Sequence, residues 1–358
     1  MMTPRERWLA VLNGQRPDLV PSDYWGTAEI TARLMDDLGC ATERALWDRL
    51  RVDKCIYVGP VHPRARETGW HLQSLFSLWH VETRSISYDD GIGEYEEDSR
   101  HPLGEAETVA EIDAFDWPEA ADFDLGALRR VCAEWKGYPI LGATSEPFYL
   151  YCRLRGMERA LEDLVVRPEI ADAILERIFR FDYSLIHRVL REAGDLVDLI
   201  YIAEDLGTQR SLLMSPNTFR KFLRPRMTQL IAMAHEHGAR VFHHDDGAIR
   251  PLLPDLIEMG IDILNPIQWR CRGMERAALA ADFGDCVVFH GGIDNQQTLP
   301  FGTPDEVRQQ VWENIEIFSA GRGYIVAPCH NIQANTPTEN VVALYEAVRE
   351  YEHPRRGV

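Results

Sequence analysis

Lysine is scarce in this 358-residue chain, and nearly all of the positive charge is arginine. The only lysines are Lys54, Lys136 and Lys221, and none lies in a recognisable site motif. A mechanism that needs a lysine Schiff base therefore has few candidates. The 7 cysteines include no Cys-x-x-Cys pair. This pattern favours buried thiols in a reducing compartment over a disulfide framework.

Positive charge is also outnumbered by negative charge. The chain has 38 Lys and Arg against 57 Asp and Glu, which gives a formal net charge of -19. An acidic surface argues against nucleic acid as a partner, because phosphates attract basic surfaces. No apolar run is long enough to span a bilayer, and the first residues lack the apolar core of a signal peptide. We expect a cytoplasmic protein that binds a small molecule.

The chain alternates regularly between short apolar runs and helical patterns. Eight runs read as strands, near residues 20, 55, 139, 198, 240, 262, 287 and 324, and most are followed by a helix. This alternation predicts a (β/α)8 TIM barrel within one domain over residues 1–358. A doubly wound open sheet is the alternative, but no GxGxxG follows the first strand to support a dinucleotide site.

Several elements carry local signals. Thr3 and Pro4 predict a capped helix over residues 3–13, an N-terminal extension to the barrel. Residues 61–125 interrupt the alternation, and within them 81–88 and 93–97 predict a β-hairpin around the Asp-Gly turn at 89–91. Further on, single helices are expected over 148–164, 168–193 and 215–236.

Polar residues gather where the predicted strands end. In a TIM barrel the carboxyl ends of the strands form one rim, where ligands bind and catalysis takes place. The rim candidates are Asp23, Tyr24, Trp25, Glu146, Glu204, Asp205, Gln209, His243, His244, Asp246, Asn265, Gln268, His290, Asp294, Cys329, His330, Asn331 and Gln333.

The case for a metal rests on His244, Asp246 and Cys329. Residues i and i+2 of a strand point to the same side, and the last strand of a closed barrel lies beside the first. An imidazole, a carboxylate and a thiolate together suit Zn²⁺ with one open position. The structural interpretation has equal weight: Cys329 as a buried thiol and His244 as a hydrogen-bonding rim residue. His330 is an alternative ligand, and His243 fits the barrel wall better than the site.

Other rim residues allow more than one interpretation. Glu146 and Glu204 suit a ligand, an acid or a base, and two carboxylates flanking a sugar would also fit glycoside hydrolysis. Arg153 and Arg155 near the start of a helix suit either an anion site or solvated charge.

Five runs of the sequence together resemble the uroporphyrinogen decarboxylase superfamily. They cover essentially the whole chain and read MTPRERWLAVLNGQRPDLVP, EDLGTQRSLLMSPNTFRKFLRP, HHDDGAIRPLLPDLIEMGIDILNPIQ, HGGIDNQQTL and CHNIQANTPTENVVALYEAV. The resemblance implies a TIM barrel and a tendency to form homodimers.

The resemblance implies two activities. Uroporphyrinogen decarboxylases bind a polycarboxylate tetrapyrrole with N-terminal arginines, but the corresponding PSDYWGTAEI lacks those arginines. The superfamily's zinc-dependent methyltransferases move a methyl group from a corrinoid protein to a thiol and hold zinc through a His-x-Cys-Gly motif and a later cysteine. Here His244 matches the histidine, Asp246 takes the place of the first cysteine, and Cys329 matches the later one. An oxygen ligand makes a stronger Lewis acid, so a folate acceptor also fits.

We therefore predict a methyltransferase-like enzyme that moves a methyl group between a corrinoid and a thiol or folate, with a corrinoid protein as partner. The metal ligands are His244, Asp246 and Cys329, and the catalytic groups are Glu204, Asp246 and His330. Cofactor-binding residues are Glu146, Gln209, Asn265, Gln268 and Asn331. The alternatives are a decarboxylase of a porphyrinogen or smaller acid, and a barrel that binds a corrinoid or tetrapyrrole without catalysis.

Overall fold

The computed structural model describes residues 1–63, 77–88 and 93–351, and it divides into two compact units. Unit 1 comprises Met1–Ile56, Lys136–Pro139 and Asp262–Val358, and unit 2 comprises Tyr57–Trp135 and Ile140–Ile261. The short strand β1 (Ile56–Tyr57) falls at the division. That residues 1–358 form a single domain stays a prediction. Each unit is described separately.

The sheet of unit 1 is parallel. Its strands are β7 (Ile263–Asn265), β8 (Val288–Ile293) and β9 (Tyr324–Pro328). β7 pairs with β8, and β8 pairs with β9. β8 and β9 are buried along their whole length, as expected of strands covered on both faces.

The regular strand expected near residue 20 is absent from this sheet, so that prediction was wrong in detail. The segment forms only isolated parallel bridges, Ser22 with Val326 and Gly26 with Ile332. Pro21 has no N–H and cannot donate to a continuous ladder, although its carbonyl accepts from the Val326 amide at 2.9 Å. The first segment therefore lies beside the last strand, as a barrel requires.

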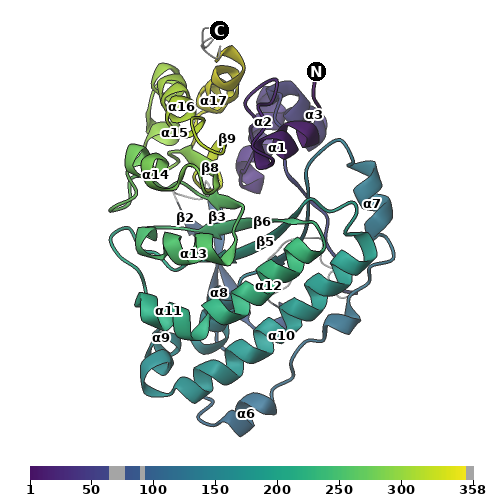
Figure 1. Cartoon of the computed structure of the whole chain (residues 1–358), viewed down its shortest axis with the longest axis vertical. Helices are drawn as coiled ribbons and strands as arrows, with labels where there is room; N and C mark the ends of the chain where they lie inside the picture. The colour runs from purple at the N-terminus through teal and green to yellow at the C-terminus, as the bar shows by residue number, and fades with distance from the viewer. Residues whose placement is uncertain (64–76, 89–92, 352–358) are drawn as a thin grey trace. The chain divides into compact units, whose positions relative to one another are not determined.

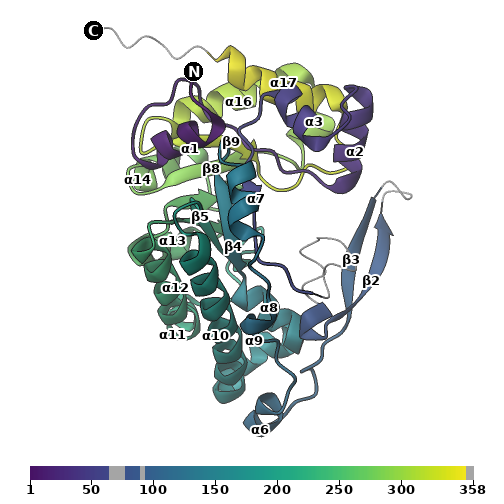
Figure 2. The same cartoon turned by 90° about the vertical axis from the view of Figure 1, so that its right-hand side faces the viewer.

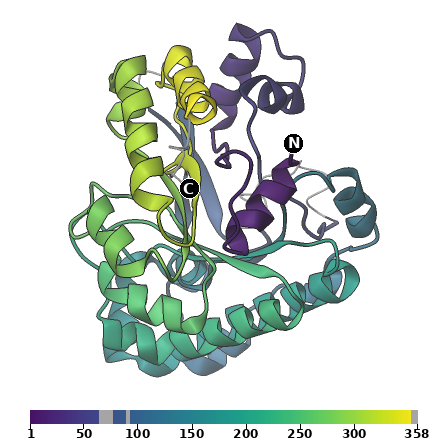
Figure 3. The same ribbon diagram turned by 45° about the horizontal axis from the view of Figure 1, so that its top comes forward.

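Two helices of unit 1 begin with a reciprocal capping box. At α1, Thr3 caps the helix as predicted, and the Glu6 side chain completes the box. Thr303 and Glu306 do the same at α16. Figure 3 shows α16 and α17 side by side. The helices are α1 (Pro4–Leu12), α2 (Ala28–Asp37), α3 (Glu43–Leu50), α14 (Arg276–Phe283), α15 (Thr298–Phe301), α16 (Pro304–Phe318) and α17 (Thr338–Glu350).

Unit 2 also contains parallel strands, β4 (Ile140–Ser145), β5 (Leu199–Glu204) and β6 (Arg240–Asp245). β5 pairs with β4 on one side and with β6 on the other. The register between β5 and β6 is unbroken from Leu199 and Arg240 to Glu204 and Asp245. The three carboxyl ends therefore lie along one edge.

Helices cover this sheet, and the longest is α10, a 26-residue helix that starts at Pro168 as predicted. Figure 1 shows α10 and α12 running side by side. Among the described residues, no helix combines the length and apolarity needed to cross a membrane. The helical segments are η1 (Ser77–Trp79), α6 (Val109–Asp113), η3 (Ala120–Asp122), α7 (Leu128–Glu134), α8 (Pro147–Arg155), α9 (Met157–Val166), α10 (Pro168–Ala193), α11 (Pro216–Phe222), α12 (Arg224–Glu236), η4 (Arg250–Leu252) and α13 (Leu253–Met259).

Two helices predicted as continuous are broken. Gly156 has φ 84, which ends α8 before α9 begins. The second predicted helix divides at Leu223, because Pro225 supplies no amide hydrogen to the preceding turn. Helical periodicity continues through both breaks, which explains why the pattern missed them.

The predicted hairpin is confirmed as β2 (Glu82–Tyr88) paired antiparallel with β3 (Gly93–Arg100). Figure 2 shows the two strands side by side. Asp98 of β3 forms an ion pair with Arg153 of α8, and both side chains are mostly buried. This pair holds the hairpin against α8 within unit 2. The turn expected at residues 89–91 falls in a stretch that the structure does not describe.

Candidate ligand site at the strand ends

The register of β4, β5 and β6 sorts the polar residues at their ends onto two faces. Thr144 pairs with Tyr201, which pairs with Phe242, so these side chains share a face. Ser145, Ile202 and His243 are paired one residue further on and occupy the opposite face. By the same alternation, the first face carries Glu146, Asp205, His244 and Asp246, and the second carries Glu204 and Asp245.

Residues of the first face form the strand-end cluster, which we define as Glu146, Asp205, His244 and Asp246. The His244 ring stacks on Tyr201 with centroids 5.9 Å apart. Its Nε2 lies 3.8 Å from Asp246 Oδ2 and 3.9 Å from Asp205 Oδ1. One imidazole nitrogen thus faces oxygens of two carboxylates.

His244 and Asp246 supply a donor pair that fits a divalent metal. Ligand atoms 2.0–2.2 Å from one tetrahedral ion lie roughly 3.3–3.6 Å apart, close to the 3.8 Å between His244 Nε2 and Asp246 Oδ2. A nitrogen and carboxylate oxygens suit zinc, manganese or iron. His244 and Asp246 were predicted as ligands, and Asp205 was a rim candidate without an assigned role.

Glu146 brings a carboxyl group with near-neutral acidity. Burial raises its pKa to about 7, with a further contribution from the negative charge of Asp205. The positive charges of His244 and Arg153 act in the opposite direction. Among the described residues, its carboxylate has no hydrogen-bond donor and no ion-pair partner. Such a carboxyl group is suited to transfer protons near neutral pH.

Residues of the second face hold the scaffold together. Glu204 accepts hydrogen bonds from the Phe148 amide at 2.9 Å and the Tyr149 amide at 3.3 Å, so it caps α8. Asp245 accepts from the Leu206 amide at 2.8 Å. Burial raises the pKa of both carboxyl groups well above its usual range. The catalytic role predicted for Glu204 stays a prediction, and its contacts are those of a structural residue.

His243 lies on the same face and has the structural environment favoured from the sequence. Its Nδ1 is 2.6 Å from the Ile202 carbonyl, and the ring is fully buried. Burial lowers the pKa of His243 to about 4. The ring is therefore neutral at physiological pH.

Three polar residues of unit 1, Asp23, His290 and Asn265, form a fully buried chain of contacts. His290 Nε2 is 3.3 Å from Asp23 Oδ2, and His290 Nδ1 is 2.7 Å from Asn265 Nδ2. Asp23 also accepts from the Trp25 indole and the Cys55 amide. Burial opposes its ionisation, but the Lys54 ammonium and His290 hold the pKa of Asp23 below its usual range.

Asn265, predicted to bind a cofactor, is therefore engaged with His290. The remaining predicted residues of unit 1 lie in loops. Cys329 is buried, and its thiol donates to the Ile267 carbonyl at 3.3 Å, as the structural interpretation expects. The Asn331 carbonyl accepts from the Gln333 amide at 3.0 Å. The roles predicted for Cys329, His330, Asn331 and Gln268 stay predictions, as does that of Gln209, an exposed residue of unit 2.

Charged residues near the strand ends also serve packing. Asp294 accepts from Arg270 at 2.5 Å and from the amides of Gln296 and Thr298. Arg155 is fully buried and pairs with Asp163 at 2.6 Å. Arg153 is likewise paired with Asp98. Both arginines therefore form mostly buried ion pairs within the protein, in place of the anion site or the solvated charge considered from the sequence.

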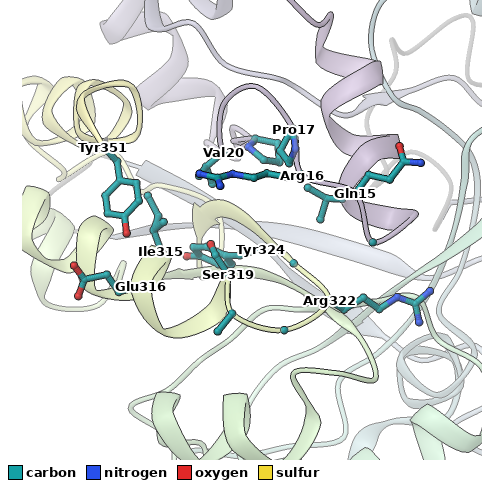
Figure 4. Close-up of a pocket in the computed structure, with 16 residues that line it drawn as sticks. Gln15, Arg16, Pro17, Val20, Ile315, Glu316, Ser319, Arg322, Tyr324 and Tyr351 are labelled. Carbon is teal, nitrogen blue, oxygen red and sulfur yellow. The ribbon is translucent and has the colours of Figure 1, made fainter. Parts of the chain in front are cut away.

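A cavity of about 410 Å³ in unit 1 contains none of the predicted site residues. It lies beside Tyr324, where β9 begins, and Arg16, Glu316 and Tyr351 border it. Figure 4 shows Glu316 and Tyr351 together at one end, with Arg16 above Tyr324. Because TIM-barrel chemistry takes place where strands end, this cavity is not the catalytic candidate.

Comparison with known families identifies the chain's relatives. The model of the family described as uroporphyrinogen decarboxylase (URO-D) matches residues 90–351. The chain belongs to this family. Curated relatives named uroporphyrinogen decarboxylase include one from Nocardioides sp. that is 25% identical over 259 residues, which cover 70% of each chain. Another from Methylibium petroleiphilum is 25% identical over 279 residues, covering 72% of this chain and 70% of the relative.

Among solved structures, a methyltransferase from Methanosarcina mazei is similar over 98% of this chain and 99% of its own, with a TM-score of 0.71 and 20% identity. This similarity shows the fold and confirms the predicted TIM-barrel class. The family and this structural neighbour are enzymes, of the decarboxylase and methyltransferase kinds.

Sequence reasoning missed several residues around the site. Asp182 and Ser145 hydrogen-bond at 2.6 Å, and Tyr201 lies beneath His244. Asp182 sits in the middle of α10 without any local motif. Tyr201 could have been found from the sequence, because it precedes the rim candidate Asp205 by four residues, and residues an even number apart on a strand point to the same face.

Proposed function

We propose that this member of the URO-D family is a metal-dependent methyltransferase that moves a methyl group between a corrinoid and a thiol or folate acceptor. The observation that carries the proposal is the placement of His244 Nε2 within 3.9 Å of oxygens from Asp205 and Asp246 at the strand ends. Parallel barrels place their chemistry at this position.

His244 and Asp246 would hold the metal, and an oxygen of Asp205 lies 3.9 Å from the same nitrogen of His244. A bound metal ion supplies Lewis acidity, which lowers the pKa of an acceptor. Tyr201 stacks on the His244 ring and fixes its orientation. The ligand roles predicted for Cys329, or for His330 in its place, remain hypotheses from the sequence.

Glu146 is the candidate proton acceptor of the strand-end cluster. With a pKa of about 7, it is partly ionised at neutral pH and can take a proton from an acceptor thiol or amine. A corrinoid would supply or receive the methyl group. The harder oxygen ligands favour an acceptor less soft than a thiolate, which makes a folate the first acceptor to test.

Decarboxylation is the second candidate, and the names of the curated relatives favour it. A tetrapyrrole with many carboxylates needs cationic partners. The strand-end cluster instead contains three carboxylates, and the chain carries a net charge of -19. The local charge therefore supports methyl transfer over the binding of a polycarboxylate.

The test is an assay of the full chain, loaded with zinc or manganese, that follows the cobalt spectrum of methylcobalamin in the presence of thiols and folates. We expect metal-dependent demethylation that falls by at least about 100-fold in His244→Ala. The control is His187→Ala, a histidine on α10 outside the cluster. Carbon dioxide release from a porphyrinogen by metal-free protein, with no methyl transfer, would overturn the proposal.

A further inference from the structure

A second cavity, of about 80 Å³, opens beside β4 within unit 2. Its walls combine four aromatic side chains with two carboxyl groups, from Tyr57, Trp79, Phe123, Phe181, Glu146 and Asp182. A cavity needs a volume of about 10–15 Å³ to hold one water molecule. This cavity therefore has room for a ligand of roughly five to eight groups, each the size of a water molecule.

The aromatic walls are held in place by their own contacts. Phe181 of α10 meets Trp79 edge-on with centroids 4.9 Å apart, and it meets Phe123 at 5.8 Å. Trp79 and Phe123 are only 5% and 4% exposed, so their rings have little freedom to move. A ligand would find these walls already formed, which reduces the entropic cost of binding.

The two carboxyl groups have oxygen atoms available to a ligand. Asp182 is 6% exposed, and Ser145 donates to its Oδ2 at 2.6 Å. Among the described residues, none donates a hydrogen bond to Asp182 Oδ1, and none donates to Glu146. The described lining includes no Lys or Arg. Arg153, whose charge acts on Glu146, is already paired with Asp98.

We infer that this cavity, which shares Glu146 with the strand-end cluster, is a binding site for a small alkylated ammonium ion. Aromatic rings present negative faces to a cation, and the attraction grows when the cation is desolvated. The two carboxyl groups have no ion-pair partner among the described residues, and they add the opposite charge that such an ion needs. An anionic ligand would meet repulsion here, and a neutral apolar ligand would leave Glu146 and Asp182 Oδ1 without a partner.

The charge requirement is tested with two ligands of the same shape. Choline and 3,3-dimethylbutan-1-ol differ in one atom, a quaternary nitrogen in place of a quaternary carbon. Calorimetric titration of the full chain with each should show choline binding at least about tenfold more tightly. Tetramethylammonium should bind as well, because the alkylated cation alone is recognised.

Site variants locate the binding. Asp182→Asn and Glu146→Gln keep the shape of the side chains, and each should weaken choline binding about tenfold or more, as should Trp79→Leu. The control Glu105→Gln removes a carboxylate that is 93% exposed and should bind choline as the parent chain does. Equal affinity for the neutral alcohol, unchanged binding in both carboxyl variants, or no binding of either cation at millimolar concentration would overturn the inference. Binding is measured by calorimetry without added metal or methyl donor, so failure of this inference is distinguishable from failure of the proposed methyl transfer.

Discussion

Both units place an aspartate beside a histidine of a parallel strand, but the polar groups of the two units are satisfied in different ways. In unit 1, the fully buried Asp23 meets His290, an indole, two backbone amides and a lysine. In unit 2, Glu146 has no hydrogen-bond or ion-pair partner among the described residues, and burial raises its pKa to about 7. The charge of Asp23 is compensated internally, whereas the Glu146 carboxyl group is left for a ligand.

This difference separates structural from functional polar residues better than position does. Buried polar groups are normally satisfied by the protein itself, and unpartnered or strongly shifted carboxyl groups cluster at functional sites. Because Glu146 lacks a described partner, the strand-end cluster is the functional candidate, and the Asp23–His290–Asn265 chain is a structural element.

The largest effect is expected from Asp23→Ala in unit 1. This change removes the acceptor of several buried donors and leaves Lys54 and His290 without their partner, so the free energy of unfolding should fall by about 3–5 kcal/mol. Urea denaturation measures it. Asp305→Ala removes an aspartate that is 98% exposed and should change the free energy of unfolding by less than about 0.5 kcal/mol. A loss below about 1 kcal/mol for Asp23→Ala would contradict the structural assignment.

Asp182→Asn in unit 2 should change the pH dependence of stability. Burial raises the pKa of Asp182 from 3.8 to about 7, so the folded state binds its proton more tightly than the unfolded state. The stability that this gives is present below about pH 4 and is lost as the pH rises through 7, by at most about 4 kcal/mol.

Relative to the parent chain, Asp182→Asn should therefore be more stable at pH 8 than at pH 5. Urea denaturation at both pH values measures this difference. Asp305→Asn should show the same pH dependence as the parent. An equal change in the free energy of unfolding of Asp182→Asn at both pH values, relative to the parent, would show that the carboxyl group does not titrate in this range.

Asp294→Ala tests a second compensated carboxylate of unit 1. The free energy of unfolding should fall by about 1–2 kcal/mol, because the amides of Gln296 and Thr298 lose their acceptor. Arg270→Met should cost less than about 1 kcal/mol, because that arginine side chain is 40% exposed. Thermal or urea unfolding measures both losses. A larger loss of stability for Arg270→Met than for Asp294→Ala would show that the ion pair contributes more than the hydrogen bonds to the two amides.

The smallest effect on stability is expected for Glu146→Gln. Replacing a half-buried carboxyl group that lacks a described partner should leave the free energy of unfolding within about 1 kcal/mol of the parent, or raise it. Methyl transfer should nevertheless fall in this variant. A large loss of stability would place Glu146 with the structural residues of unit 1.

Much of the fold could be predicted from the sequence, because strands, helices and caps have local signals. α10 begins at Pro168 and α1 is capped by Thr3, both as expected. The breaks at Gly156 and Leu223 were missed because hydrophobic periodicity continues across them. The length of the first strand was overestimated, because Pro21 has no amide hydrogen to donate to a continuous row of strand hydrogen bonds.

The candidate site was harder to predict, since its composition depends on strand register. Glu204 and Asp205 are neighbours in the sequence but point to opposite faces, and only the pairing with β6 shows which of them approaches His244. Arg155 and Asp163 form a fully buried pair that no charge pattern distinguishes from solvated residues. Asp182 enters its cavity from the middle of a helix, where the sequence carries no motif.

The most direct test of the central claim is the metal content of the protein after incubation with zinc or manganese and removal of excess ion. Elemental analysis should find about one ion per folded chain in the parent and in His187→Ala, and little in His244→Ala or in Asp205→Asn combined with Asp246→Asn. Circular dichroism confirms that each variant is folded. No retained metal in the parent, or full metal content in folded His244→Ala, would contradict the assignment of the strand-end cluster as the functional site.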